Sequence, residues 1–222
     1  MPFDIHALDK LEDYTTEKED ALYEYQNTLV ELFAKSPEAK KLHPSETFGY
    51  WAEQIIYFGD RYIGTTIPHM SRYDMDELLN SIFPKKIALA SSDEALDAIP
   101  EMIAFWTYLK REYKLKNANA ILRDLKKIKP EDYVNIINDS SRFGMTKSIL
   151  TQGMDAGFDM TNEEEMGKFF HQYNEDILKE NPDIFKNLPT IPDENMKERE
   201  RLIKEREEKR ERKAKKKQRK RH

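Results

Sequence analysis

The chain of 222 residues contains no cysteine. This absence excludes disulfide scaffolds, zinc sites built on thiolates, iron–sulfur clusters and cysteine nucleophiles. Seven glycines are too few for a collagen-like or glycine-rich chain. No apolar run approaches the roughly 20 residues that span a bilayer, and Met1 to Asp9 lack the basic start and apolar stretch of a secretory signal. We therefore expect a cytoplasmic protein without membrane insertion.

The charges of the chain fall into two blocks of opposite sign. The formal net charge is −5, but residues 197–222 hold 15 basic and 6 acidic residues, whereas residues 1–196 hold 22 basic and 36 acidic ones. Such asymmetry is typical of a folded body with an interaction tail. We predict an acidic domain over residues 1–192 and a basic tail over 193–222, with Pro189 and Pro192 marking the boundary.

Helical periodicity dominates the first 190 residues. Apolar residues recur every three or four positions, as in the stripe Leu22, Tyr25, Leu29, Leu32 and Phe33. No segment shows the alternation of a strand. We therefore expect an irregular all-α domain of short helices. The aromatic residues follow the same spacing. This favours burial in the core over a ligand-binding role for Trp51, Phe105, Trp106 and Tyr108.

Helix boundaries are predicted from capping patterns and helix-breaking residues. Thr16 and Thr161 each stand three residues before a glutamate, the spacing of a capping box. Asn117 is expected to cap a further helix. Gly59 and Gly157 occupy positions where a helix ends, and Pro84 is expected to stop the helix that begins at Asp74.

The C-terminal tail favours a helix stabilised by surface charges. Four acid-before-base pairs are spaced four residues apart and each contributes about 0.2–0.5 kcal/mol to an isolated helix: Glu200–Lys204, Glu205–Lys209, Glu208–Arg212 and Glu211–Lys215. The pairs stop at Glu211, and the last eleven residues contain no acid. Eight of those eleven are basic, namely Arg212, Lys213, Lys215, Lys216, Lys217, Arg219, Lys220 and Arg221.

These eight basic residues are the candidate nucleic-acid-binding residues. They repel one another, and a polyanion relieves that repulsion while releasing its own condensed counterions. The stretch has no aromatic residue, so base stacking is not available there. We expect phosphate contacts that are nearly independent of sequence, to RNA or the ribosome.

Several other readings of the tail stay open. A charged end can serve only to solubilise the protein, bind an acidic protein, or dock on the acidic body of its own chain. Binding to an anionic membrane surface is disfavoured, because no bulky apolar residue flanks the basic cluster. In a eukaryotic source, Lys215 to Arg221 would also fit a nuclear import signal. The oligomeric state cannot be inferred.

Motifs for catalysis or for cofactor binding are absent. No histidine pair has the i, i+4 spacing of a helical metal site, and no HExxH occurs. A site assembled from distant residues, such as His69 with Asp74 and Asp76, is disfavoured relative to surface or capping roles. Gly144 to Ser148 lacks the upstream glycine of a phosphate-binding loop. We expect a non-enzymatic protein without metal or cofactor.

Four segments resemble a group of uncharacterised bacterial helical proteins that often end in a SEC-C motif, the small zinc module also found at the end of the SecA translocase. The segments are Leu78 to Ile87, Ile99 to Leu109, Arg142 to Ser148 and Ala156 to Thr161. The resemblance implies an α-helical bacterial cytoplasmic domain with no established activity. The chain departs from the group because, without cysteine, it cannot carry the zinc module.

Within the resembling part, Arg142 and Lys147 flank Gly144 at a predicted helix start. Backbone amides at such a position can help to bind an anion. The alternative is ion pairing with Asp139 or Asp155, which we favour. Two functions therefore follow from the sequence: RNA binding through the tail, or a protein–protein adaptor that uses an apolar groove and has a solubilising tail.

Overall fold

The computed structural model describes residues 3–11, 15–42, 48–89 and 91–180. Every regular element in these ranges is helical and none is a strand, which confirms the expected all-α class. The chain divides into two compact units, Met1–Met160 and Thr161–His222. The predicted tail over residues 193–222, with its predicted helix, lies outside the described residues.

The first unit begins with a 3₁₀ turn and continues through short helices, two of which extend into π-helical turns. Its first half comprises η1 (Ala7–Lys10), α1 (Thr16–Ala34), η2 (Ala39–Lys41), α2 (Tyr50–Phe58), the π-helical turn η3 (Gly59–Ile63), α3 (Arg72–Glu77), the π-helical turn η4 (Leu78–Ile82) and α4 (Phe83–Lys86). Its second half comprises η5 (Ser92–Asp97), α5 (Ala98–Tyr113), α6 (Ala118–Leu125), α7 (Pro130–Ile137), η6 (Ser140–Arg142) and α8 (Met145–Asp155).

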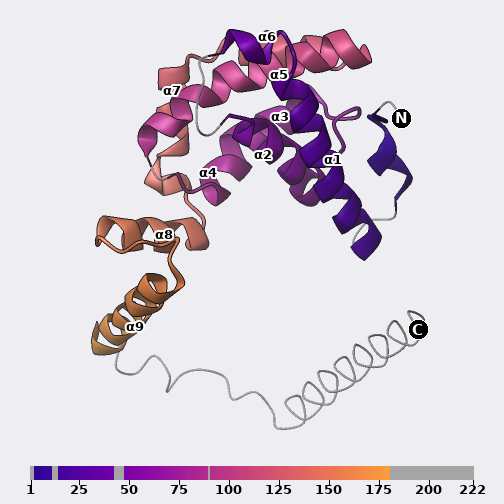
Figure 1. Cartoon of the computed structure of the whole chain (residues 1–222). Coiled ribbons are helices and arrows are strands. Elements are labelled where there is room, and N and C mark those ends of the chain that lie inside the picture. Colours follow the sequence, from indigo (N-terminus) through magenta and orange to yellow (C-terminus); the bar gives the residue numbers. More distant parts are fainter. Residues whose placement is uncertain (1–2, 12–14, 43–47, 90, 181–222) are drawn as a thin grey trace, which may run out of the picture. The chain divides into compact units, whose positions relative to one another are not determined.

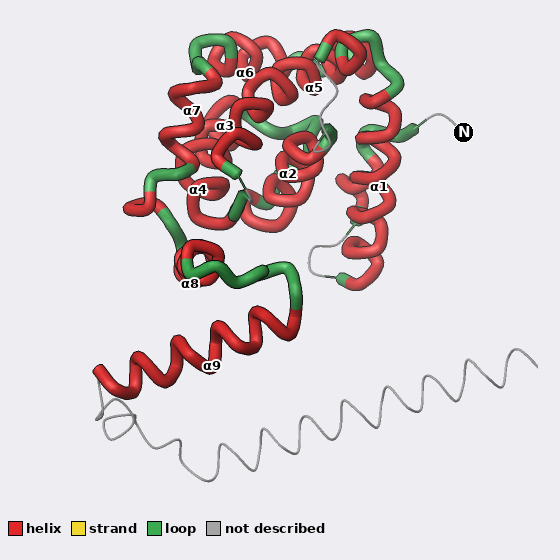
Figure 2. Tube along the Cα trace, turned by 60° about the vertical axis from the view of Figure 1, so that its left-hand side comes forward, coloured by secondary structure: helices red, strands yellow, loops and turns green. Residues whose placement is uncertain are grey.

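One hydrophobic core joins α1 to α7. Helix α2 lies between α1 and α4 (Figure 1), and Figure 2 shows the same order from another side. Helix α5 contacts α2, α6 and α7. The predicted aromatic core is confirmed, because Trp51, Phe105, Trp106 and Tyr108 are all buried. Each fully buried large apolar side chain contributes about 1.5–3 kcal/mol.

The predicted stripe of α1 forms part of that core. Leu22, Tyr25, Leu29 and Phe33 are buried, while Leu32 is only partly buried at its edge. A buried ion pair also ties α1 to η3, since Lys18 Nζ lies 2.8 Å from the Asp60 carboxylate. Apolar spacing therefore identified the inward face of α1 correctly.

Two capping residues lie one position away from the prediction. The hydroxyl of Thr15, not Thr16, accepts the Lys18 amide and caps α1. Helix α9 (Glu163–Glu180) of the second unit begins after Asn162, whose Oδ1 accepts the Glu164 amide at 3.0 Å. The predicted helix stop at Gly157 is confirmed: α8 ends at Asp155, and Gly157 is left-handed, with a φ of +87°.

Two predicted helix ends are wrong because the helix continues as a π-helical turn. Gly59 is right-handed, and the chain turns only at Gly64, whose φ is +74°. Likewise Pro84 does not stop a helix: it stands in the first turn of α4, which follows η4 without a break and reaches Lys86. A proline is tolerated in a first turn because that position needs no amide donor.

Candidate functional site

A groove of about 450 Å³ lies on the first unit between α3 with η4, α6 and α7. Its volume falls within the usual range for ligand-binding clefts. Its apolar lining consists of Met75, Leu79, Ile121, Leu125, Ile128 and Ile136. Its polar lining consists of Arg72, Tyr73, Asp76, Asn80, Asp124 and Lys127. This combination of an apolar floor and a charged rim is the main candidate site.

The π-helical turn η4 supplies two groove residues. Leu79 and Asn80 both lie within η4 and both line the groove. Helices of this type are rare and occur frequently at functional sites. Asn80 donates to Asp76 one turn earlier, at 2.9 Å, which fixes both side chains at the rim.

Asp124 of α6 is the centre of charge at the rim. It accepts a hydrogen bond from Lys127 Nζ at 2.7 Å and lies 3.6 Å from Arg72 Nη1. The hydrogen bond from Lys127 lowers the pKa of Asp124 below its usual value, and the nearby charges add to that effect. The carboxylate is therefore ionised and links α3 to α6 across the groove.

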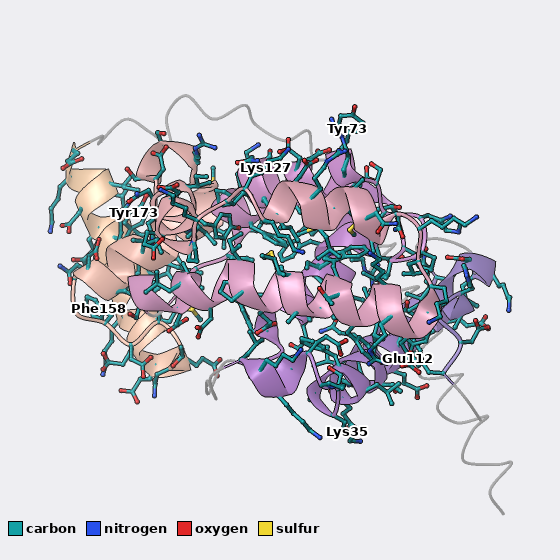
Figure 3. The ribbon with its side chains drawn as sticks, turned by 90° about the horizontal axis from the view of Figure 1, so that it is seen from above. Lys35, Tyr73, Glu112, Lys127, Phe158 and Tyr173 are labelled. Carbon is teal, nitrogen blue, oxygen red and sulfur yellow. The ribbon has the colours of Figure 1, made fainter. Side chains whose placement is uncertain are left out.

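Tyr73 is an exposed aromatic residue at the same rim. Its side chain is 69% exposed, and the Arg72 guanidinium lies 4.6 Å from its ring centroid. Figure 3 shows Tyr73 and Lys127 pointing outward along one edge of the molecule. Tyrosine and arginine are enriched among the residues that contribute most to binding at protein interfaces. The groove thus offers apolar contacts on its floor and polar contacts at its rim.

The sequence-predicted basic residues cannot be compared with this groove. Arg212, Lys213, Lys215, Lys216, Lys217, Arg219, Lys220 and Arg221 lie outside the described residues. The further candidates Arg142 and Lys147 lie in the first unit and are described.

Arg142 has the predicted ion-pair partner, whereas Lys147 has a different role. Arg142 Nε lies 3.1 Å from Asp139, as favoured from the sequence. Lys147 donates instead to the carbonyl of Ile137 at 2.6 Å, which completes the last turn of α7. Burial lowers the pKa of Lys147 to about 8. The Gly144 amide donates to the Lys85 carbonyl at 3.1 Å and is thus engaged within the fold.

These contacts join two of the segments noted in the sequence, Leu78 to Ile87 and Arg142 to Ser148. Gly144 bonds to Lys85, and Arg142 Nη1 donates to the Asn80 carbonyl at 3.1 Å. A Cβ at Gly144 would lie only 2.8 Å from that same Lys85 carbonyl oxygen. The stretch from Arg142 to Ser148 therefore packs the start of α8 against α4.

His69 does not meet the partners considered from the sequence. Asp74 caps α3 by accepting the Ser71 amide at 2.6 Å, and Asp76 accepts from Asn80. His69 instead reaches Asp9, with Nε2 lying 3.0 Å from Oδ2, and His6 reaches the same oxygen at 2.8 Å. The association of His69 with Asp74 and Asp76, which the sequence disfavoured, is thus not formed, and Asp74 has a capping role.

The histidine cluster and the groove rim were not predicted from the sequence, for different reasons. His6 at the start of η1 and Asp9 within it stand three residues apart, whereas metal ligands paired on an α-helix stand four apart. That three-residue spacing was the available signal. Tyr73 and Lys127 come from separate helices, and nothing in their local spacing indicates that they share a rim.

Comparison with known proteins provides no relative: no family model, no curated protein and no solved structure matches the chain. In the part of the chain that the structure describes, no helix has both the length and the apolar character needed to cross a membrane.

Proposed function

We propose that this protein is a non-enzymatic cytoplasmic RNA-binding protein that contacts phosphates, including those of ribosomal RNA, through the basic residues at 212–221. The observation that carries the proposal is the run of eight lysines and arginines among the last eleven residues, without any acid. Neutralising phosphates releases condensed counterions, so the affinity comes from charge density and not from base recognition.

Some carboxylates of the acidic body are not available to the tail, because they already form ion pairs within the body. Glu38 is paired with Arg111 at 2.8 Å and Asp60 with Lys18 at 2.8 Å. Asp124 is paired in the same way with Lys127. These three carboxylates already have basic partners within the body, so a polyanion competes for the tail only with the remaining acidic residues of the body.

The test compares the binding of three forms of the protein to a fluorescent single-stranded RNA of about 20 nucleotides. The forms are the natural chain, a chain ending at Glu211, and a chain in which the eight basic residues are replaced by glutamine. With six to ten phosphate contacts, affinity falls about 10³- to 10⁵-fold on duplex between 50 and 200 mM salt, and somewhat less on a single strand. Fluorescence anisotropy measures this fall.

We expect both altered forms to lose binding at 50 mM salt. The glutamine form controls for chain length, because it keeps every residue position. Equal binding by the natural and altered forms would show that the tail does not hold the RNA. Binding that is unchanged between the two salt concentrations would contradict phosphate contacts as its source.

The groove supports a second candidate function, a protein–protein adaptor. Its occupant would be an amphipathic helix of a partner protein. The apolar side chains of that helix would contact Leu79 and Leu125, and its polar side chains would face Arg72 and Asp124. Tyr73→Ala should weaken the complex at 0.5 M salt about tenfold or more, as for an interface anchor. Tyr23→Ala is the matched control, because Tyr23 is 68% exposed and does not line the groove.

The two functions differ in their response to the same variants. An adaptor keeps its partner when the chain ends at Glu211 and loses it with Tyr73→Ala. An RNA-binding tail shows the opposite pattern. Measuring both variants at 50 mM and 0.5 M salt, with and without nuclease, separates the two functions.

A further inference from the structure

Two histidines and one aspartate from distant parts of the chain converge at the surface of the first unit. His6 precedes η1, Asp9 lies within it, and His69 follows η3. The nearest ring nitrogens, His6 Nδ1 and His69 Nε2, lie 2.8 and 3.0 Å from Asp9 Oδ2. Their three potential ligand atoms all lie within 4.8 Å of one another.

The segment that carries His6 and Asp9 is anchored in the core. Ile5 and Leu8 are buried on either side of His6, and the hydroxyl of Tyr25 donates to the Ile5 carbonyl at 3.0 Å. A 3₁₀ turn has three residues per turn, so residues 6 and 9 lie one above the other on the same side. The backbone at the start of η1 therefore holds the side chains of His6 and Asp9 next to each other.

The turn that carries His69 is anchored independently. Ile67 and Met70 are buried on either side of it. The side-chain amide of Asn117 donates to both of their carbonyls, at 3.0 and 2.8 Å. His69 thus stands on a short loop whose two flanks are fixed to the start of α6, so the loop presents its imidazole at a fixed place.

A neighbouring hydroxyl orients the carboxylate. Thr66 Oγ1 donates to Asp9 Oδ1 at 2.5 Å, so the other oxygen, Oδ2, faces the two imidazoles. The Asp9 carboxylate is thus held with one oxygen bonded to Thr66 and the other between the His6 and His69 rings.

We propose that His6, Asp9 and His69 bind a divalent transition-metal ion of the zinc type. Two imidazole nitrogens and one carboxylate oxygen are ligands that zinc accepts in proteins, with water completing a tetrahedron. Thr66 then serves as the outer-shell partner that fixes the carboxylate. The imidazoles are 51% and 64% exposed, so the ion can enter directly from solvent.

Metal binding here would link the start of the chain to a loop 60 residues further on. An ion that binds only the folded protein stabilises it by mass action. The metal ion would therefore cross-link η1 to the loop after η3 and stabilise the folded state. This proposal is independent of RNA binding and of the groove, because it shares no residue with either.

The experiment titrates tag-free full-length protein, first treated with EDTA and dialysed, with Zn²⁺ in a calorimeter. We expect one saturable site per chain. His6→Gln and His69→Gln should each lower the affinity at least tenfold, and Thr66→Val about 10-fold or more, as for other outer-shell partners. His171→Gln is the matched control, because His171 is 80% exposed and lies on α9 with Glu175 as its neighbour.

A second measurement does not depend on variants. In the unaltered protein, Zn²⁺ should shift the imidazole resonances of His6 and His69 and leave that of His171 unchanged, and it should raise the thermal midpoint. Absence of saturable binding overturns the proposal. So does an affinity that stays the same in His6→Gln and His69→Gln, or one that falls equally in His171→Gln.

Discussion

The carboxylate of Glu101 in α5 accepts a hydrogen bond from the backbone amide of Ala52 in α2, at 2.9 Å. Its other oxygen accepts the Gly49 amide at 3.0 Å, so one buried side chain caps the start of a neighbouring helix. Burial raises the pKa of Glu101 to about 7, although the amide hydrogen bonds oppose that rise. Only 3% of the residue is exposed.

The raised pKa of Glu101 predicts a stability that falls as pH increases. The folded protein keeps this proton up to about pH 7, whereas the unfolded chain loses it near 4.5. Between these values the folded state binds more protons, so the free energy of unfolding decreases with rising pH by about 3 kcal/mol in total. Glu101→Gln removes this contribution, and denaturant unfolding of both proteins at pH 5 and pH 8 measures the difference.

Glu38→Gln is the control for that prediction. The hydrogen bond from Arg111 lowers the pKa of Glu38, so its stabilising contribution is present above its unfolded pKa of 4.5 and is lost as pH falls. The difference in the free energy of unfolding between Glu38→Gln and the natural protein should therefore stay constant between pH 5 and pH 8. A constant difference for Glu101→Gln as well would show that Glu101 does not titrate in this interval.

Gly144 is predicted to resist substitution because of a close backbone contact. Its φ of −79° is open to any residue, but a Cβ there would lie 2.8 Å from the Lys85 carbonyl oxygen. Gly144→Ala should cost about 1–3 kcal/mol, because α4 and α8 must separate. Gly167→Ala on α9, where a Cβ meets nothing within 4 Å, should leave the thermal midpoint unchanged or raise it. Equal effects of the two substitutions would contradict the contact.

The sequence predicted the parts of the fold that depend on local periodicity. The apolar spacing of α1 identified the buried Leu22, Leu29 and Phe33, because one face of a helix repeats every three to four residues. The π-helical turns were not predicted. A π-helical turn bonds each residue to the fifth along the chain, but the run from Leu78 to Ile82 has the same apolar spacing as an α-helix, so spacing alone does not distinguish the two.

The sites that depend on long-range contacts could not be predicted in the same way. Glu101 was one of many acids, and its partners Gly49 and Ala52 lie about fifty residues earlier. His69 meets Asp9 across 60 residues of sequence, on a loop whose Ile67 and Met70 carbonyls accept hydrogen bonds from Asn117. Asn117 itself was expected to cap α6, yet its side chain makes no capping hydrogen bond and donates to the carbonyls of Ile67 and Met70 instead.

Asn117 is therefore predicted to be structurally important. Asn117→Ala leaves the carbonyls of Ile67 and Met70 without these donors and should cost about 1–3 kcal/mol in denaturant unfolding. Asn119→Ala is the matched control, since Asn119 is exposed and makes only a 3.4 Å hydrogen bond to Lys116. Asn117→Ala should also weaken Zn²⁺ binding at the proposed site, because the loop that carries His69 loses its anchor. Equal stability of the two variants would show that Asn117 does not hold the loop.

Clustering of charge, and not net charge alone, should determine RNA affinity. Eight phosphate contacts to a single strand predict a slope of log K against log salt of about −5.6, and four predict about −2.8. Replacing Lys215, Lys216, Lys217 and Lys220 by glutamine should therefore halve the slope.

The control replaces Lys204, Arg206, Lys209 and Arg210, which removes the same charge from the part of the tail that also contains glutamates. Those glutamates neutralise much of the local positive charge, so few counterions are released there on binding RNA. The slope should stay near that of the natural chain. A slope that falls equally in both variants would mean that the phosphate contacts extend along residues 197–222 and are not confined to the last eleven.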